Sequence, residues 1–506
     1  MRLQPRIFYF ETLVVTIIFF LLLFVANTLN YFNFDIMGIH CARLADTCSF
    51  IYYFIENNLN PINYGNFNLS SIEGKCVSEF PIIYYLAAII NVIFKIKVIL
   101  ILKLITYFFL WLSFVSTYKL ALIIIENKIS AILFTLIFFT STVLIYYGTF
   151  LMPDIHAFGL CTLGIYFNFY SLKHAKSDKY FRYSILLVFF SVLLKASFVP
   201  YYFLILVMHY FSKREIIVKK SNILTSIITI ALFISWYLFA NYYNKINNNT
   251  YYTLSTRPFW DHDIQTNLST IKFIFDYWSN KYYLPTVFHM VYILFLFYIF
   301  FGKKNKTDLI VILYCLISIL AHFALFLPQF IDHDYYFIVL IPFIAIITFT
   351  SYKNILNRFE ISNLLLYSNY IAIFLIFISS FFYLKLNIFR RYNSYVDQNS
   401  VINNKLISVS NSSQINQIPL DSKIIVIGDG SENISLYNLR RFGITFKNFN
   451  EKREILVKFA LQANFIILLF PKNDYIPEYL QKLVKLEKVE KWNYNNTVLF
   501  KIKNEI

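Results

Sequence analysis

Long apolar runs recur along almost the whole of this chain and restrict what it can fold into. An α-helix needs about 20 apolar residues to cross the hydrocarbon core of a bilayer. Hydrophobic residues make up 58% of the 506-residue sequence, which is more than the core of a water-soluble protein requires. The sequence therefore predicts a polytopic α-helical membrane protein. We expect about eleven spans, at 8–29, 98–124, 129–149, 155–172, 181–197, 199–211, 221–240, 284–302, 308–327, 335–351 and 361–384.

The basic residues indicate how these spans are oriented. The net charge of +17 would suit a nucleic-acid partner, but the Lys and Arg residues gather in short loops between the apolar runs. Such loops mark the cytoplasmic side of a membrane, so we expect the lipid bilayer, and no nucleic acid, as their partner. Arg2 and Arg6 precede a first run that is too long for the core of a cleaved signal peptide. We therefore expect a retained anchor, a cytoplasmic N-terminus and a location in the plasma (inner) membrane.

One apolar segment, 80–94, decides the sidedness of everything that follows it. It is about 15 residues long, has Pro81 near its start and is followed by Lys95 and Lys97. That length is short for a hydrocarbon core of about 30 Å. We interpret the segment as an interfacial or re-entrant helix on the outer face. The alternative, a short tilted span, would place the basic loops outside.

This topology gathers the polar loops on the outer face. They contain Asp46 with Glu79, then Asp154, then Arg257 with Asp261-His262-Asp263, and then Asp332-His333-Asp334. Transporters usually carry ionisable groups near the midplane and show repeated halves. Neither feature is evident here, because the charged residues identified within spans, Lys103 and Lys195, lie near outer helix ends.

The C-terminal segment has a different composition. Buried-strand patterns occur at 423–429, 464–470 and 496–503, with helical stretches near 432–442, 451–462 and 476–488. This alternation predicts a small extracytoplasmic α/β domain with a mostly parallel sheet. We divide the chain into a transmembrane domain, 1–386, whose first outer loop is 31–97, and a soluble domain, 387–506. Gly428-Asp429-Gly430 lacks the full phosphate-loop fingerprint and is interpreted as a strand-to-helix turn.

Three charged residues each have two interpretations. Asp46 suits a general base at the membrane surface, or forms a helix-surface ion pair with Arg43 three residues before it. Asp154 follows Pro153 and either stabilises the first turn of a helix or faces Asp46 across a cleft. Lys195 either extends to the interface or holds a lipid phosphate.

Further outer-face residues have ligand chemistry. His333 suits hydrogen bonding to phosphate or proton transfer, and Tyr335 and Tyr336 suit the membrane interface. The residue types of Asp261-His262-Asp263 suit a divalent metal, but three adjacent side chains rarely converge on one ion. We assign no metal and no other cofactor.

Three cysteines, Cys41, Cys48 and Cys76, fall in the first outer loop. An oxidising compartment would permit one disulfide. If 41–48 is helical, Cys41 and Cys48 are about 10 Å apart, which is too far for a bond. Either Cys76 pairs with one of them or the thiols remain unpaired.

These motifs resemble those of one family of membrane enzymes. The family comprises polyprenyl-phosphate-sugar-dependent glycosyltransferases of the C-type membrane fold, in the protein O-mannosyltransferase and lipid A aminoarabinose transferase group (glycosyltransferase family 39 and its bacterial relatives). The resemblance covers essentially the whole chain, and the matching motifs have the expected order and sidedness. They are 43–47, 78–81, 152–154, Lys195 and 333–336.

The resemblance implies an inverting transfer of a sugar from a polyprenyl-phosphate-linked donor, at the extracytoplasmic face, to a lipid, polysaccharide or protein acceptor. It implies that Asp46 deprotonates the acceptor and that Asp154 supports it, while Lys195 and His333 hold the phosphate. We assign catalysis to Asp46 and Asp154. We assign substrate binding to Arg43, Glu79, Lys195, Arg257, His333, Tyr335 and Tyr336.

Two departures from the family pattern leave questions open. The first loop lacks the adjacent Asp-Glu pair of some relatives, so Asp35 competes with Asp46 for the role of base. Glu79 stands where the aminoarabinose transferases have Lys, which weakens the case for that sugar. The alternative functions are a non-catalytic transporter or binding protein for lipid-linked glycans, and a glycan polymerase or ligase.

Overall fold

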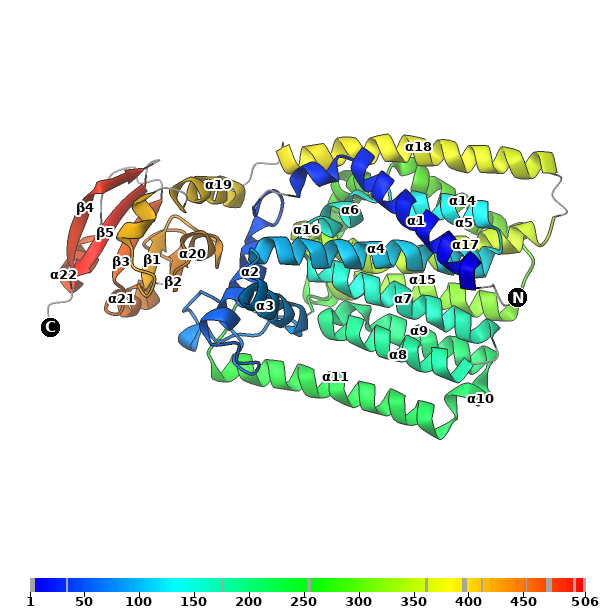
Figure 1. Ribbon diagram of the computed structural model, residues 1–506, viewed down its shortest axis with the longest axis horizontal. Coiled ribbons are helices and arrows are strands. Elements are labelled where there is room, and N and C mark those ends of the chain that lie inside the picture. The colour runs from blue at the N-terminus through cyan, green and yellow to red at the C-terminus, as the bar shows by residue number, and fades with distance from the viewer. Residues whose placement is uncertain are drawn as a thin grey trace. The chain divides into compact units, whose positions relative to one another are not determined.

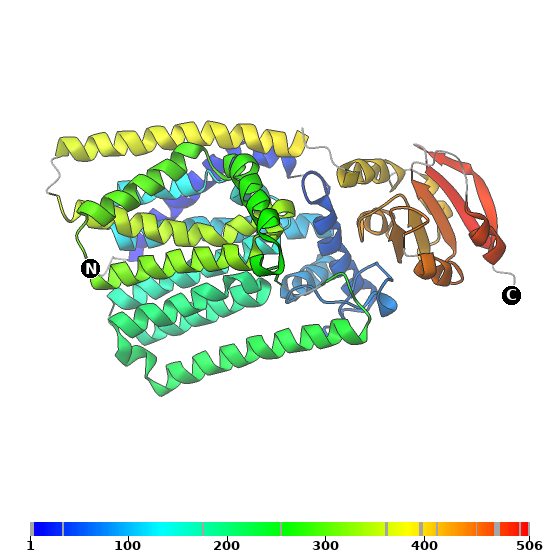
Figure 2. The ribbon, with the colours of Figure 1, turned by 180° about the vertical axis from the view of Figure 1, so that it is seen from behind.

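A computed structural model describes residues 5–32, 35–174, 177–252, 256–359, 363–393, 398–410, 413–451, 453–469, 476–494 and 497–503 (Figures 1 and 2). The chain forms two compact units. The helical unit comprises Met1–Phe32, Lys103–Leu238 and Ser255–Phe389, and the mixed unit comprises Asn33–Leu102, Phe239–Leu254 and Arg390–Ile506. The first outer loop thus belongs to the same unit as the C-terminal residues. We expected a domain boundary after residue 386. The two units divide three residues later, after Phe389.

Helices occupy the positions of all eleven predicted apolar runs. The α-helices that lie wholly or mainly in the helical unit are α1 (Pro5–Val25), α4 (Val98–Ile125), α5 (Lys128–Phe138), α6 (Thr142–Gly148), α7 (Pro153–Lys173), α8 (Ser177–Leu194), α9 (Val199–Ser212), α10 (Arg214–Ile217), α11 (Lys220–Ile246), α12 (Ile264–Phe273), α13 (Ser279–Tyr282), α14 (Pro285–Phe301), α15 (Lys306–Phe326), α16 (Gln329–Asp332), α17 (Ile341–Leu356) and α18 (Asn363–Asn393). Short 3-10 or π-helical segments join them: η1 (Thr28–Tyr31), η3 (Ala196–Phe198), η4 (Phe259–Asp261), η5 (Ile274–Trp278) and η6 (Asp334–Leu340).

The helical unit has the composition and exposure of a bundle in lipid. Among the described residues, five helices are long and apolar enough to cross a membrane: α4, α11, α15, η6 continued by α17, and α18. Two bent helix pairs raise that number to seven. The remaining predicted spans correspond to helices that are shorter or less apolar. The most apolar window of α11 is only 11% buried, whereas that of η6 and α17 is 89% buried. Apolar side chains that face outward over whole helices require a lipid surrounding. The chain is a multi-pass membrane protein.

The span expected at 129–149 is not continuous. It is broken between α5 and α6, whose axes differ by 76°. The Ser141 hydroxyl accepts a hydrogen bond from the backbone N–H of Leu144, so the chain stops and starts a new helix there. The span expected at 284–302 corresponds to α14, which begins with Pro285 and is bent by 100° from the helical segment before it.

The mixed unit combines short helices with a five-stranded sheet. Its helical elements are α2 (Cys41–Glu56), η2 (Ile72–Gly74), α3 (Ile82–Phe94), α19 (Gln398–Ser410), η7 (Ser413–Gln417), α20 (Ile434–Leu439), α21 (Arg453–Ala460) and α22 (Glu478–Leu483). Its strands are β1 (Ile424–Ile427), β2 (Gly443–Phe446), β3 (Phe465–Leu469), β4 (Lys485–Tyr494) and β5 (Thr497–Lys503), in the order β2-β1-β3-β5-β4.

The sheet is mixed, so the prediction of a mostly parallel sheet was wrong. β1 pairs in parallel with β2 and β3, whereas β5 pairs antiparallel with β3 and β4. β4 occupies part of the stretch predicted as a helix at 476–488. From Val484 to Glu487 the side chains alternate between more and less buried, which is the period of a strand.

The first outer loop continues this sheet beyond β2. The backbone N–H of Leu69 donates to the carbonyl of Gly443, and the N–H of Gly443 donates to the carbonyl of Phe67. Leu69 also packs against the apolar core that includes Ile425 and Ile466. The loop and the C-terminal strands therefore share one folded body.

The interpretation of Gly428-Asp429-Gly430 as a strand-to-helix turn is confirmed. Gly428 has a φ of 104°, and a Cβ there would lie 2.6 Å from the carbonyl oxygen of Leu469. The carboxylate of Asp429 accepts hydrogen bonds from the backbone N–H groups of Ser431 and Ser435. The buried carboxylate thus holds the turn into α20.

We predict that Gly428→Ala destabilises the sheet by about 2 kcal/mol, because the new side chain meets backbone at a φ that L-residues disfavour. Hydrogen exchange of β1 and β3 amides in the full-length protein should accelerate roughly 30-fold. Gly430→Ala is the matched control, since its Cβ would lie 3.7 Å from the nearest atom, in the Lys447 side chain. Equal exchange in the two variants would contradict this account.

Candidate active site

The first polar cluster surrounds Asp46 on α2, within the mixed unit. The Asp46 side chain is buried, with 2% of its surface exposed. Its Oδ1 accepts a hydrogen bond of 2.8 Å from the Asn433 side chain. Burial raises the pKa of Asp46 to about 6, while the charge of Arg43 and hydrogen bonds from Asn433 and Tyr252 oppose that rise. A carboxyl group with this pKa is mostly ionised at neutral pH and close to the range that suits a general base.

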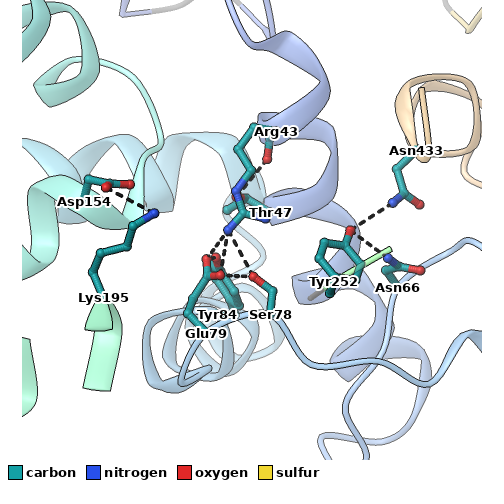
Figure 3. Close-up of polar contacts among 10 residues, drawn as sticks. All are labelled: Arg43, Thr47, Asn66, Ser78, Glu79, Tyr84, Asp154, Lys195, Tyr252 and Asn433. Carbon is teal, nitrogen blue, oxygen red and sulfur yellow. Dashed lines mark hydrogen bonds and ion pairs between the residues drawn. The ribbon is translucent and has the colours of Figure 1, made fainter. Parts of the chain in front are cut away.

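Arg43 lies one turn before Asp46 and is bound to Glu79 (Figure 3). Its Nη2 donates to both carboxylate oxygens of Glu79 at 2.6 Å and to the hydroxyl of Ser78 at 3.1 Å. The hydroxyls of Ser78 and of Tyr84 on α3 also donate to Glu79. Glu79 thus has a cation and two hydroxyl donors around it, and it fixes the guanidinium beside α2.

Tyr252 completes this cluster from the segment that follows α11. Its hydroxyl oxygen accepts hydrogen bonds from the side-chain amides of Asn66, at 3.0 Å, and Asn433, at 3.5 Å (Figure 3). The Tyr252 hydroxyl in turn hydrogen-bonds to Asp46 and thereby lowers the pKa of that carboxyl. Two donors of different chemistry therefore serve one carboxylate.

The second cluster lies in the helical unit, where α7 begins and α8 ends. Asp154 is in the first turn of α7, directly after Pro153, as the sequence predicts. Its carboxylate is fully buried, and its Oδ1 lies 3.3 Å from Nζ of Lys195 (Figure 3). The Lys195 ammonium is also 5.2 Å from the ring centroids of both Tyr335 and Tyr336. Lys195 is thus a partly buried cation in an aromatic setting.

His333 belongs to the same cluster. Its ring centroid is 5.2 Å from that of Tyr335. Sequence reasoning did not select Tyr147 or Asp334 as site residues, although Asp334 lies inside a quoted motif. The Tyr147 hydroxyl donates to Asp334 at 2.5 Å, and its ring packs edge-on against Tyr335. These two residues support the aromatic side of the cluster.

Other candidates are placed away from these contacts. The Arg257 side chain is exposed, and its backbone N–H donates to the Gln329 side chain. Asp261 and His262 are exposed, while Asp263 caps α12 by accepting from the N–H of Thr266. Among the described residues, no group of three or more His, Cys, Asp or Glu side chains could hold a metal ion.

The first loop contains one further candidate base, Asp35, and the three cysteines that could form a disulfide. Asp35 is exposed and accepts a hydrogen bond from the Tyr437 hydroxyl at 3.1 Å. Only one of the two competing carboxylates, Asp46, is therefore buried. The suggested disulfide between Cys76 and Cys41 or Cys48 does not form, and all three thiols are buried.

Comparison with solved structures identifies the architecture. ArnT from Cupriavidus metallidurans in the apo state has a TM-score of 0.61 and 9% identity, covering 96% of this chain and 97% of that one. ArnT bound to undecaprenyl phosphate gives 0.60 and 9%, covering 98% of each chain. The arabinofuranosyltransferase AftD from Mycobacteria gives 0.58 and 9%, covering 99% of this chain and 40% of that one.

The chain has the C-type glycosyltransferase fold. The expected fold class is thereby confirmed. No protein-family model and no curated protein matches the sequence, so the similarity is one of structure.

We predict that Asp46 titrates near pH 6 in the resting protein. The infrared band of the protonated carboxyl should decrease with a midpoint of about 6, and Asp46→Asn should remove it. Arg43→Met should raise the midpoint by about one pH unit, because it removes the nearby cation. Asp178→Asn, at a surface ion pair with Lys219, is the control and should leave the band unchanged. A midpoint near 4 would contradict the burial argument.

Proposed function

We propose that this protein is a glycosyltransferase that moves a sugar from a polyprenyl-phosphate-linked donor to an acceptor of the cell envelope. The observation that carries the proposal is the fold shared with ArnT over 98% of both chains, in a structure of ArnT bound to undecaprenyl phosphate. The two polar clusters supply the two kinds of group that such a transfer requires. One is a carboxylate base, and the other is a cation for the departing phosphate.

The chemistry assigned to Asp46 is proton removal from the acceptor. The acceptor O–H or N–H gives its proton to the carboxylate as its oxygen or nitrogen bonds to the anomeric carbon. The bond from that carbon to the phosphate oxygen breaks, and its electron pair leaves with the polyprenyl phosphate. One displacement from the face opposite the phosphate inverts the anomeric configuration. A base with a pKa of about 6 is ionised for this role at neutral pH.

The chemistry assigned to Lys195 and His333 is stabilisation of the departing phosphate. A phosphate monoester is a good leaving group, so neighbouring positive charge contributes more than a strong acid would. The ion pair with Asp154 holds the Lys195 ammonium, and Tyr335 and Tyr336 provide aromatic faces beside it. Asp154 thereby acts through Lys195. Arg257 remains a candidate for binding the donor.

Arg43 and Glu79 are assigned to acceptor binding. Because Glu79 is surrounded by donors, this position presents a neutral, ordered surface. The paired charges of Arg43 and Glu79 offer a phosphate no net attraction, which favours phosphate binding at Lys195. This argues for a sugar and acceptor that differ from those of the aminoarabinose transferases.

The proposed setting is the extracytoplasmic face of the plasma membrane. The positive-inside distribution supports a cytoplasmic N-terminus and an extracytoplasmic segment from residue 387 onward. The proposed division is a transmembrane domain, 1–386, and a soluble domain, 387–506. No metal is assigned to the reaction.

We predict transfer activity from a panel of synthetic polyprenyl-phosphate sugars with a cell-envelope extract as acceptor. Turnover should release polyprenyl phosphate in step with labelled product, and kcat/KM should fall as the pH drops through about 6, where Asp46 takes up a proton. Asp46→Asn should reduce kcat about 10³-fold. Lys195→Met should reduce it about 100-fold, because it removes charge stabilisation from the leaving group.

Two aspartates that begin helices provide a matched control. Asp154→Asn should lower kcat at least about 10-fold through its loss of hold on Lys195. Asp178→Asn, in the first turn of α8, should not change it. Asp35→Asn decides between the two competing bases and should retain activity. Donor binding without turnover, together with unchanged behaviour of Asp46→Asn, would overturn the proposal in favour of a lipid-linked-glycan transporter.

A further inference from the structure

A buried hydrogen bond joins the first outer loop to the C-terminal segment. Asn433, immediately before α20, is fully buried and donates its side-chain amide to Oδ1 of Asp46. Residues 46 and 433 are 387 positions apart in the sequence. The described residues provide no donor to the amide oxygen of Asn433. Turning the amide over would put that oxygen against a carboxylate, so the contact to Asp46 fixes the orientation of the side chain.

A second contact anchors the same turn. The Asn68 side-chain amide donates to the backbone carbonyl of Glu432, at 2.7 Å, and to the Glu432 carboxylate, at 2.8 Å. Asn68 is held in turn by its bridge to Gly443 at the edge of β2. The first outer loop, which contains both Asn68 and Asp46, thus determines the position of Asn433. A side chain held at both its backbone and its amide loses little freedom when it orients a neighbour.

We propose that Asn433 is a positioning residue for the catalytic base, so that residues 390–506 complete the site where the acceptor is deprotonated. This inference rests on the proposed function. The amide holds Oδ1 of Asp46 and so orients the carboxylate, whose remaining lone pairs receive the acceptor proton. An amide suits this task because it donates without titrating, and it therefore does not compete for the proton.

The charged and titratable groups around this carboxylate come from several elements. They are Arg43 on α2, Cys76 and Glu79 in the loop before α3, Tyr251 and Tyr252 after α11, and Glu432 before α20. Arg43 and the donors favour the ionised form of Asp46, whereas burial and Glu79 oppose it. Loss of the Asn433 amide removes one of the favourable contributions, and a carboxylate in its place adds a repulsive one.

The test compares three variants by the pH dependence of kcat/KM, with the polyprenyl-phosphate sugar of the panel that supports wild-type turnover. Asn433→Ala should lower kcat about 10-fold and move the acidic limb about one pH unit upward. Asn433→Asp should move the limb further, because two carboxylates share the site. Asn438→Ala is the matched control: Asn438 is on α20 and bonds to Asn403. It should keep the wild-type limb.

The outcomes separate the two claims. An active wild-type enzyme whose Asn433→Ala and Asn433→Asp variants retain its acidic limb would overturn the positioning role alone. A wild-type enzyme without turnover on any donor of the panel would overturn the proposed function and the positioning role together. A limb that shifts equally in Asn433→Ala and Asn438→Ala would show general loosening of α20 and would also overturn the role. The positioning role is supported only if the pH of the acidic limb rises in the order wild type, Asn433→Ala, Asn433→Asp.

Discussion

The carboxylate of Asp46 is held almost entirely out of water, and the polar structure of the mixed unit is arranged around that fact. Burial alone would keep such a group protonated at neutral pH. The guanidinium of Arg43 and the donors Asn433 and Tyr252 limit the rise of its pKa to about 6. These groups come from α2, from the turn before α20 and from the segment that follows α11. The ionised form of one buried carboxylate is therefore stabilised by three segments that are distant in the sequence.

In the helical unit, too, the cost of burying polar groups decides where they lie. Its helices face lipid with apolar side chains, so polar groups gather where helices begin or end. Asp154 is in the first turn of α7, Lys195 follows α8 and Asp334 begins η6. Backbone groups at helix ends already require polar surroundings, so charged side chains there disturb the apolar bundle least. The termini of these helices are thus the natural places for reactive groups in a chain of this composition.

Apolar run length predicted where the helices lie, and the Pro153-Asp154 pattern predicted how α7 begins. The break between α5 and α6 escaped prediction because the length of the run outweighed Thr140-Ser141-Thr142, three hydroxyl residues of the kind that cap a helix. β2 has only four residues, and it is defined by pairing with β1 and with residues 67–69. The local sequence predicted Asp46 as a candidate base. It contains no signal for Asn433, since their contact depends on tertiary structure across most of the chain.

The pairing of residues 67–69 with β2 also fixes an order of events during synthesis. The loop that carries Asn68 is made early, and its partner Gly443 is made only when most of the helices already exist. Closing so long a stretch of chain is slow compared with forming a helix. Until it closes, Asp46 lacks its amide donor and remains open to water. The polar surroundings of Asp46 would thus be completed only after the whole chain from residue 69 to residue 443 has been made.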